Sequence, residues 1–373
     1  MRVVFSSYDS PGNPYYGGGG AAAIHEVARR LARSHQVTVL TAACPTPPPA
    51  HPEGVHYEPV GPRAAGPRLG QLLFHFSLPL RVRRRAFDVW CESLTPPFST
   101  AFLQSCTHRP VVALTQILSG EAMRRKYRLP FERVERLGLR TYRHAIATSK
   151  HLRGRLLAIN PRLQVEVIPN GVSGAWVRME PRRAERHVLF LGRLDIEQKG
   201  LDLLLDALAG LDSPLPWPVV VAGSGTPDQE AFLQRRLHEL GLGASVRAVG
   251  RVAGTARQAL FEDAALLVLP SRFEASPLVM FEAFCYRLPV VRFAIPELED
   301  IPDTVAVAVP PFDVQAFGRA LRSLAKEPGR REALGHAAKA YVRDFDWDDL
   351  AARYARFFNA VSRGAPAGGS RLA

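Results

Sequence analysis

Two glutamates separated by seven residues, Glu274 and Glu282, are the first candidates for chemistry. The apolar residues 264–269 predict a buried strand that stops at Pro270, and Ser276-Pro277 then supplies an N-cap and a favourable first helical residue. One carboxylate therefore lies before the helix, and the other lies about a turn and a half inside it. Amides of a first helical turn bind phosphate, and carboxylates accept hydrogen bonds from vicinal hydroxyls. The pattern predicts a ligand that carries both phosphates and sugar hydroxyls.

Two basic residues near the middle of the chain form a second candidate group. Residues 187–192 predict a buried strand that ends at Arg193, and a polar loop leads to Lys199-Gly200 before a leucine-rich helix. Two fixed cations at a strand end and a helix start can neutralise a diphosphate leaving group as negative charge builds on it. The alternative interpretation is a pair of ordinary solvated loop cations.

A glycine-rich loop near the N-terminus is a third candidate. Residues 2–7 predict a strand, a long loop then reaches Gly17-Gly18-Gly19-Gly20, and residues 21–34 predict a helix with one apolar face. Glycine has no side chain, so the backbone can approach a pyrophosphate or a sugar closely at the start of the helix. A flexible turn would look the same, and four consecutive glycines are not the dinucleotide-binding fingerprint.

Taken together, these groups resemble one family of enzymes. Glu274-x7-Glu282, followed by Leu288-Pro289-Val290-Val291, resembles the signature of retaining GT-B glycosyltransferases, family 4 (glycosyl transferases group 1). Gly192-Arg193-Leu194 with Lys199-Gly200-Leu201 resembles the diphosphate site of that family. Ile168-Pro169-Asn170-Gly171-Val172 resembles the end of its first domain. The resemblance covers nearly the whole chain, and its most specific motifs lie in the second half.

The resemblance implies an α/β protein with the GT-B fold, in which two Rossmann-like domains face a central cleft. It also implies transfer of a hexose-type sugar from a nucleotide sugar, UDP- or GDP-linked, to an acceptor hydroxyl with retained anomeric configuration. We expect domains at 1–172 and 186–345, a linker at 173–185, a terminal helix at 346–362 that packs back on the first domain, and a disordered tail at 363–373.

The resemblance also implies roles for single residues. Arg193 and Lys199 would stabilise the departing diphosphate. Glu282 would bind the ribose hydroxyls, and Glu274 would hold the hexose. Further donor contacts are expected at the glycine loop, after strands of both domains and at the start of the helix near 277, from Gly19, Gly20, Gln116, Gly223, Arg251, Val252, Ser276, Pro277, Leu278 and Val279. The loop after the first strand would contact the acceptor through Tyr8, Asp9, Tyr15 and Tyr16.

Two stretches depart from the family pattern. In many relatives a histidine follows the strand at 111–115, whereas this chain has Gln116, which can hydrogen-bond a sugar hydroxyl but cannot carry a proton. Residues 290–297 lack the glycine pair that relatives place before Pro-Glu. The leaving phosphate itself is thought to take the acceptor proton in this family, so the histidine is dispensable. No metal and no cofactor are expected beyond the nucleotide-sugar co-substrate, since the two cations replace a metal ion.

Composition bounds these interpretations. The chain has 373 residues, enough for two domains, and 48 basic against 35 acidic residues give a net charge of +13, which favours anionic ligands. Its four cysteines form no Cys-x-x-Cys spacing, so we expect neither a zinc site nor disulfides, and a reducing cytoplasmic compartment.

The segment 69–85 is relevant to localisation. No run approaches 18 apolar residues, so the sequence predicts no membrane-spanning helix. Leucines and aromatic residues nevertheless precede Arg81-Val82-Arg83-Arg84-Arg85, and this pattern is typical of peripheral contact with an anionic membrane, here its inner face, or with an anionic acceptor. The alternative is a core-packing helix that ends in solvated arginines. The acceptor could be a small metabolite, a natural product, a lipid or a polysaccharide.

Two other functions stay open. A sugar-nucleotide enzyme of the same fold, such as an epimerase, would keep the diphosphate site and differ in its product. A non-catalytic binder would keep the donor and release no nucleoside diphosphate, and Gln116 is its only support in the sequence. A nucleic-acid partner is not expected, because the basic residues are scattered and no nucleic-acid-binding module is recognised.

Overall fold

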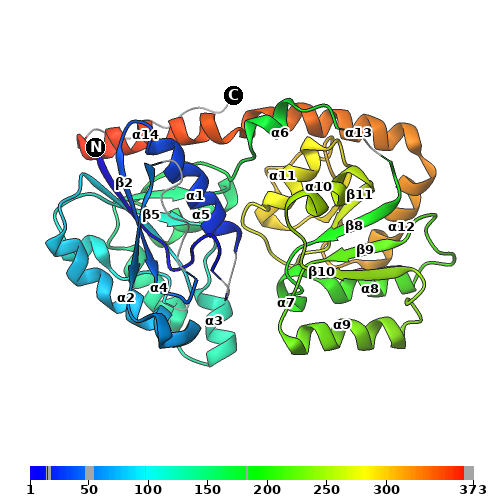
Figure 1. Ribbon diagram of the computed structural model, residues 1–373, viewed down its shortest axis with the longest axis horizontal. Coiled ribbons are helices and arrows are strands. Elements are labelled where there is room, and N and C mark those ends of the chain that lie inside the picture. The colour runs from blue at the N-terminus through cyan, green and yellow to red at the C-terminus, as the bar shows by residue number, and fades with distance from the viewer. Residues whose placement is uncertain (14, 16–17, 47–53, 97, 182–183, 365–373) are drawn as a thin grey trace. The chain divides into compact units, whose positions relative to one another are not determined.

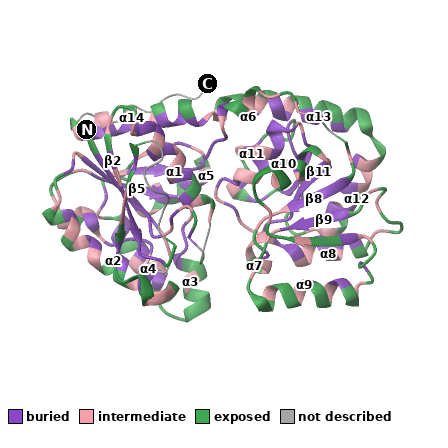
Figure 2. Ribbon diagram, in the orientation of Figure 1, coloured by how far each residue is buried: buried purple, intermediate pink, exposed green. Residues whose placement is uncertain are grey.

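The computed structural model describes residues 1–13, 15, 18–46, 54–96, 98–181 and 184–364. Its chain divides into two units, the first comprising Met1–Gly171 with Trp347–Ala373 and the second Val172–Asp346 (Figure 1). Each unit has a parallel β-sheet with helices packed on its faces, and the sheets form the most deeply buried part of each unit (Figure 2). This is the predicted α/β class with two Rossmann-like domains.

The first unit contains a seven-stranded parallel sheet in the order β3-β2-β1-β4-β5-β6-β7. Five of its strands are rich in buried apolar residues, as expected for a sheet covered on both faces. The strands are β1 (Arg2–Ser6), β2 (Gln36–Ala42), β3 (His56–Val60), β4 (Val89–Ser93), β5 (Val111–Thr115), β6 (His144–Ala147) and β7 (Gln164–Val167).

The helices of this unit follow the strands in the usual alternating order, and the last one arrives from the far end of the chain. They are α1 (Gly19–Leu31), α2 (Gly66–Arg84), α3 (Gly120–Tyr127), α4 (Phe131–Leu139), α5 (Lys150–Ile159) and α14 (Trp347–Ser362). In α14, Asp348 accepts hydrogen bonds from Arg30 (3.0 Å) and Arg33 (2.9 Å), both near the end of α1. The ring of Phe358 lies 6.0 Å from that of Phe5 in β1, so α14 completes the core of the first unit.

The second unit contains a six-stranded parallel sheet in the order β10-β9-β8-β11-β12-β13, the order of a dinucleotide-binding fold. Its strands are β8 (His187–Leu191), β9 (Val219–Ala222), β10 (Val246–Gly250), β11 (Ala264–Leu269), β12 (Val290–Phe293) and β13 (Val307–Val309). Its helices are α6 (Gly174–Arg178), α7 (Ile196–Lys199), α8 (Leu201–Ala209), α9 (Pro227–Glu239), α10 (Gly254–Glu262), α11 (Leu278–Cys285), α12 (Val314–Lys326) and α13 (Pro328–Tyr341).

Two sequence-based expectations about local structure need adjustment. The helix expected to start at Pro277 begins at Leu278, and Pro277 takes the N-cap position with extended ψ, so Ser276 stands too early to cap it. The segment 173–185, expected as a linker, contains α6 and belongs to the second unit. Its Trp176 ring lies 5.9 Å from Tyr286, an edge-on contact that holds the segment on the core. Residues 365–373 of the expected tail lie outside the described residues.

An ionisable side chain lies in the core of the first unit. Glu92 at the end of β4 is 2% exposed, and it accepts hydrogen bonds from the amide of Ala101 (2.6 Å) and the hydroxyl of Tyr142. Thr100 hydrogen-bonds the same hydroxyl at 2.7 Å. Burial raises the pKa of Glu92 to about 7, because the two hydrogen bonds do not offset the desolvation of its carboxylate.

This shift predicts a pH dependence of stability. Folded Glu92 holds a proton up to about pH 7, whereas in the unfolded chain it loses the proton near its ordinary pKa of 4.5. The free energy of unfolding of the first unit should therefore fall, on the order of 3 kcal/mol, as the pH rises through that window. Glu92→Gln should abolish this decline, and urea unfolding of both proteins across the window measures it.

Comparison with the variant is needed because His75 changes the free energy of unfolding in the opposite direction as the pH rises. Burial lowers its pKa from 6.5 to about 4, so its contribution to stability grows as the pH rises. Subtracting the variant's pH profile from that of the wild type removes the His75 contribution. A difference that does not change with pH would mean that Glu92 is already ionised in the folded protein.

Candidate functional site

The strand order of the second unit defines where a ligand is expected. Strand order reverses between β8 and β11, which pair directly with each other. Open parallel sheets bind ligands outside the carboxyl ends of the strands at such a switch point. The segments that follow these two strands are 192–199 and 270–277, and they contain Arg193, Lys199 and Glu274. The topology thus brings together two motifs that are 75 residues apart in sequence.

Lys199 is positioned by a short helix and a glycine. Asp195 caps α7 by accepting the amide hydrogen bond of Gln198 at 3.0 Å, and Lys199 is the last residue of this helix. Gly200 follows with a φ of +62°, and a Cβ there would lie 2.0 Å from the carbonyl oxygen of Pro270. Only glycine allows the backbone after β8 to lie this close to the backbone after β11.

Lys199 and Glu274 form an ion pair at this point. The Nζ of Lys199 lies 2.7 Å from Oε1 of Glu274, which also accepts a hydrogen bond from the hydroxyl of Ser271 at 2.6 Å. Their side chains are 16% and 4% exposed. One oxygen of the carboxylate is thus paired, and the ammonium group has two further N–H donors besides the one directed at Glu274.

The loop that carries Glu274 is itself fixed by Arg272. Its guanidinium group binds Asp202 of α8 through two hydrogen bonds, of 2.9 and 2.6 Å, and donates a third to the carbonyl of Ile196 at 2.8 Å. A bidentate pair of this kind fixes direction as well as distance. The sequence analysis assigned no role to Arg272, and its partner Asp202 becomes apparent only when α8 and the loop lie side by side.

Arg193 is more loosely held. Its side chain is 56% exposed, and its guanidinium group hydrogen-bonds the side chain of Gln198 at 2.6 Å. Asp195 lies 3.6 Å from the same group. Arg193 therefore lies in the loop after β8 with an exposed planar group that can reorient.

Glu282 lies in α11 and is paired with Arg257 of α10. The two side chains are 15% and 26% exposed, and the guanidinium carbon of Arg257 lies 5.2 Å from the ring centre of Phe261. One oxygen of Glu282 accepts the hydrogen bond from Arg257. Arg257 was not a predicted site residue, because a pairing between side chains of two separate helices leaves no local signal in the sequence. Ser276 and Pro277 are buried, whereas Leu278 and Val279 are half-buried at the start of α11.

The loops after β9 and β10 complete this edge of the sheet. Gly223 has a φ of +146°, and a Cβ there would lie 1.7 Å from the carbonyl oxygen of Gly192. Its amide donates to the carbonyl of Gly250 at 2.8 Å, so consecutive strands end in direct backbone contact. Arg251 is exposed and Val252 half-buried directly after β10, the outermost strand on this side.

The first unit has a separate polar group at the carboxyl edge of its sheet. A Cβ on Gly20 would lie 3.9 Å from the side-chain amide of Gln116, which follows β5. Asn170, which follows β7, donates to Oε1 of Gln116 at 3.2 Å. Gly19 is exposed at the first position of α1. The structure thus brings Gln116 to the glycine loop, and Asn170 joins them although the sequence analysis gave it no ligand role.

The four residues expected to contact an acceptor lie in different surroundings. Asp9 accepts the amide hydrogen bond of Gly18 at 3.0 Å, so a carboxylate already occupies the approach to α1. Tyr8 is 5% exposed, and its hydroxyl donates to the carbonyl of Pro67 at 2.7 Å, so it supports the start of α2 from below the surface. Tyr15 is 39% exposed. Tyr16 lies outside the described residues.

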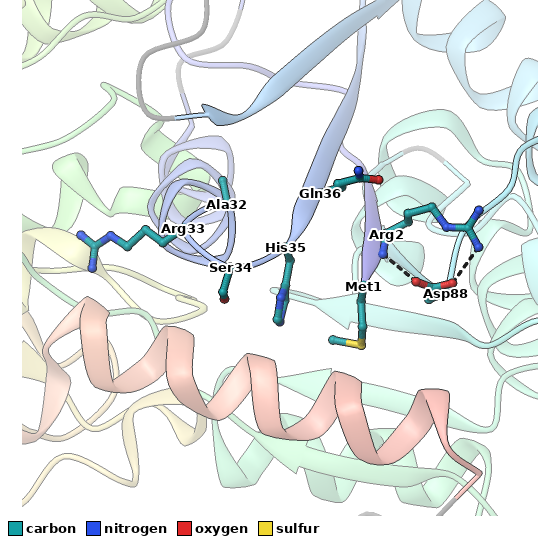
Figure 3. A pocket seen from close by; sticks show the side chains of 8 residues that line it. All are labelled: Met1, Arg2, Ala32, Arg33, Ser34, His35, Gln36 and Asp88. Atoms are coloured by element: carbon teal, nitrogen blue, oxygen red, sulfur yellow. Dashed lines mark hydrogen bonds and ion pairs between the residues drawn. The ribbon is translucent and has the colours of Figure 1, made fainter.

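A shallow hollow lies at the opposite, amino edge of the first unit's sheet (Figure 3). It is lined by Met1, Arg2, Ala32, Arg33, Ser34, His35, Gln36 and Asp88, and none of these was a predicted site residue. Arg2 and Asp88 pair within it at 2.9 Å. In the described part of the chain, no three His, Cys, Asp or Glu side chains gather closely enough to hold a metal ion. All four cysteines are free thiols.

Comparison with known proteins identifies both halves of the chain. Residues 17–174 match the family model described as glycosyltransferase family 4, and residues 185–327 match the model described as glycosyl transferases group 1. A glycogen synthase of Mycobacterium tuberculosis is 32% identical over 208 residues, which make up 54% of this chain and 50% of that protein. The chain therefore spans only about half the length of that relative.

Solved structures show the same fold over nearly the full length. A sucrose-phosphate synthase from Thermosynechococcus elongatus superposes with a TM-score of 0.81 at 19% identity, covering 98% of this chain and 100% of that one. The Anabaena protein Alr3699/HepE, solved with UDP-glucose, gives a TM-score of 0.73 at 17% identity, with 96% and 100% coverage. At this level of identity the likeness establishes the GT-B fold alone.

The close approach at Gly200 makes a prediction about stability. Gly200→Ala should lower the free energy of unfolding of the second unit by about 2–4 kcal/mol, because the methyl group meets the Pro270 carbonyl and the residue has a left-handed backbone. Gly243→Ala is the matched control, since a Cβ at Gly243 meets nothing within 4 Å. Chemical unfolding of both variants measures the difference, and equal stabilities would contradict the role assigned to Gly200.

Proposed function

This chain belongs to the group 1 family of glycosyl transferases, and we propose that it transfers a hexose-type sugar from a UDP- or GDP-linked nucleotide sugar to an acceptor hydroxyl, with retained anomeric configuration. The observation that carries the proposal is the Lys199–Glu274 pair at the switch point of the second unit. Such a pair offers a cation to phosphate and a carboxylate to sugar hydroxyls at one place. The UDP-glucose complex of the Anabaena protein supports a nucleotide sugar as the donor.

Each half of the donor would meet groups of fitting chemistry. The diphosphate would lie against Lys199 and the reoriented Arg193, with first-turn amides of α11 beside it. The ribose hydroxyls would donate to the second oxygen of Glu282 while Arg257 keeps the first. The base would lie near the loops that contain Gly223 and Arg251, where backbone groups can recognise its edge.

The chemical step would need little beyond charge stabilisation. The bond between the anomeric carbon and the phosphate oxygen breaks, and its electron pair stays on the departing diphosphate. Lys199 and Arg193 neutralise the charge that develops there. The acceptor oxygen bonds to the anomeric carbon on the face that the phosphate leaves, and its proton passes to the leaving phosphate oxygen. Gln116 would contribute a hydrogen bond and no proton transfer.

The proposal also includes sugar transfer without a metal ion, because Arg193 and Lys199 provide positive charge at the diphosphate. Two cations face the diphosphate, and they supply the neutralisation that a divalent ion supplies in other transferases. The acceptor is assigned to the first unit, near Asp9, Tyr15 and the glycine loop. Its class could be a small metabolite, a natural product, a lipid or a polysaccharide.

Nucleotide binding tests the donor site. One of UDP, GDP and ADP should bind the wild-type chain at micromolar strength, and Glu282→Ala should lose about 1–3 kcal/mol of binding free energy, because a half-buried acceptor of ribose hydrogen bonds is removed. Calorimetric titration measures both. Glu332→Ala is the matched control, since Glu332 is a 75% exposed glutamate of α13, and it should bind like the wild type. If none of the three nucleotides binds, the proposal of a nucleotide-sugar site in the second unit is contradicted.

Turnover tests the role of Arg193. Arg193→Gln should lower kcat for nucleoside diphosphate release by about a hundredfold or more, because one of two cations on the leaving group is lost. Its exposed side chain makes a folding defect unexpected, and Arg235→Gln, which alters an arginine of similar exposure in α9, should retain full turnover. A coupled assay measures the release of nucleoside diphosphate from the nucleotide sugar, with water as the acceptor.

Product analysis separates the remaining functions. NMR of the sugar at early time should show the anomeric configuration of the donor. An inverted product would contradict the retaining mechanism. Conversion of the nucleotide sugar to a stereoisomer without diphosphate release would identify an epimerase. Tight nucleotide binding with no chemical change would identify a binding protein.

A further inference from the structure

The helix α2 exposes apolar side chains along one face. Leu69, Leu73, Phe76 and Leu80, here called the α2 stripe, are 54%, 40%, 67% and 51% exposed. Their spacings of four, three and four residues place them on one side of an α-helix. A second apolar face of the same helix, formed by Gly70, Phe74, Leu78 and Val82, is buried against the first unit. The α2 stripe is therefore apolar surface in excess of what packing requires.

The α2 stripe continues into neighbouring apolar groups. The ring of Phe76 lies 5.6 Å from that of Phe98, which lies 5.6 Å from Phe131 at the start of α4. Phe131 in turn contacts Tyr127, at 5.9 Å between ring centres. Tyr127 and the nearby Leu129 are 48% and 55% exposed. This series of ring contacts, in which Phe131 itself is buried, connects the exposed α2 stripe with the exposed side chains of the turn between α3 and α4. The exposed residues form the apolar surface discussed below, and exposed apolar patches mark interaction sites.

Arginines border this surface. A hollow beside the α2 stripe is lined by Phe76, Ser77, Leu80, Arg81, Arg84 and Arg85. Arg81 and Arg85 share the carboxylate of Glu58, at 2.8 and 2.5 Å. In the part of the chain that the structure describes, no carboxylate pairs with Arg83 or Arg84, and both are exposed. The α2 sequence from 66 to 84 contains no acidic residue.

The α3–α4 side adds further positive charge. Arg124, Arg125, Lys126 and Arg128 are all exposed next to Tyr127, and Lys126 lies 5.5 Å from its ring centre. Glu121 and Glu132 are the acidic residues that pair here, with Arg125 and Arg124. The border of the apolar surface therefore carries a net positive charge at both ends.

We propose that the surface formed by the α2 stripe, Tyr127 and Leu129 docks on an anionic lipid bilayer. Aliphatic and aromatic side chains would enter the headgroup region, while the flanking arginines bind lipid phosphates. A second copy of the chain is a poorer occupant, because a two-fold interface would bring the same arginines against each other. Nucleic acid is also a poorer occupant, because it offers no apolar partner for the exposed leucines of this surface. No helix in the described residues is long and apolar enough to cross a bilayer, so the docking would be peripheral.

Vesicle flotation tests the charge requirement. The full chain should bind vesicles of phosphatidylcholine with about 30% phosphatidylglycerol and should not bind pure phosphatidylcholine. Arg83→Gln with Arg84→Gln should weaken binding about 25-fold, since each arginine near an anionic surface contributes about fivefold. Arg319→Gln with Arg343→Gln, two exposed arginines of the second unit, removes the same charge and should leave binding unchanged. Equal binding to neutral vesicles would overturn the proposal.

The apolar requirement needs its own variants. Phe76→Ser with Leu80→Ser should weaken binding to the anionic vesicles by about tenfold or more. Phe312→Ser is the control, because Phe312 is 47% exposed and belongs to the second unit. Unchanged binding of the double variant would mean that only charge is at work, and would overturn the proposal. Thermal unfolding of each variant verifies that the first unit is folded.

Tryptophan fluorescence provides a second test, which does not depend on the folding of the serine variant. Phe76→Trp keeps the surface apolar, and its fluorescence should shift to shorter wavelength when anionic vesicles are added. Lipids brominated on their acyl chains should quench the added signal relative to the wild type. No shift and no quenching would overturn the proposal. A concentration-dependent dimer in light scattering, abolished by Phe76→Ser, would assign the surface to a second copy instead.

Discussion

The buried ion pair between Lys199 and Glu274 sets the conditions that the second unit must meet. A carboxylate that is 4% exposed is costly unless it is paired and hydrogen-bonded. Satisfying it requires the segment after β8 to lie against the segment after β11, and that approach is possible only because Gly200 carries no side chain beside the Pro270 carbonyl. Gly223 meets the same requirement between β8 and β9, against the Gly192 carbonyl. Gly200 therefore permits the approach that brings Lys199 to Glu274, and Gly223 permits a similar approach between the neighbouring strand ends.

How far the sequence could predict this arrangement depends on whether the cause is local. The strand at 111–115 was predicted at its observed bounds, because a short, mostly apolar run is by itself typical of a buried strand. The N-cap of α5 has an equally local cause, because the hydroxyl of Ser149 accepts the amide hydrogen bond of Leu152. Around 277 the prediction was one residue early, since proline suits both the N-cap and the first helical position and only the observed ψ decides between them.

Pairings between distant segments could not be predicted from the sequence. Nothing near Glu282 indicates that Arg257 occupies one of its oxygens, because that partner comes from a different helix. Tyr8 was expected at an acceptor site, yet a tyrosine after a strand is compatible with either a surface or a core position. Its burial is decided by α2, whose Pro67 carbonyl accepts the hydroxyl. Gln116 was expected near a sugar, and the structure adds that Asn170 already orients its amide.

The helix α2 shows that a core-packing interpretation can account for only part of a helix. A helix with one apolar face is assigned to a core, and α2 does bury Phe74, Leu78 and Val82. Its apolar residues, however, extend around to the α2 stripe, so the two faces oppose each other and the overall amphipathic signal of the helix is small. A core explains only the first face. The second face is exposed next to Arg83 and Arg84, and the proposed bilayer, apolar inside and negative at its surface, matches both features.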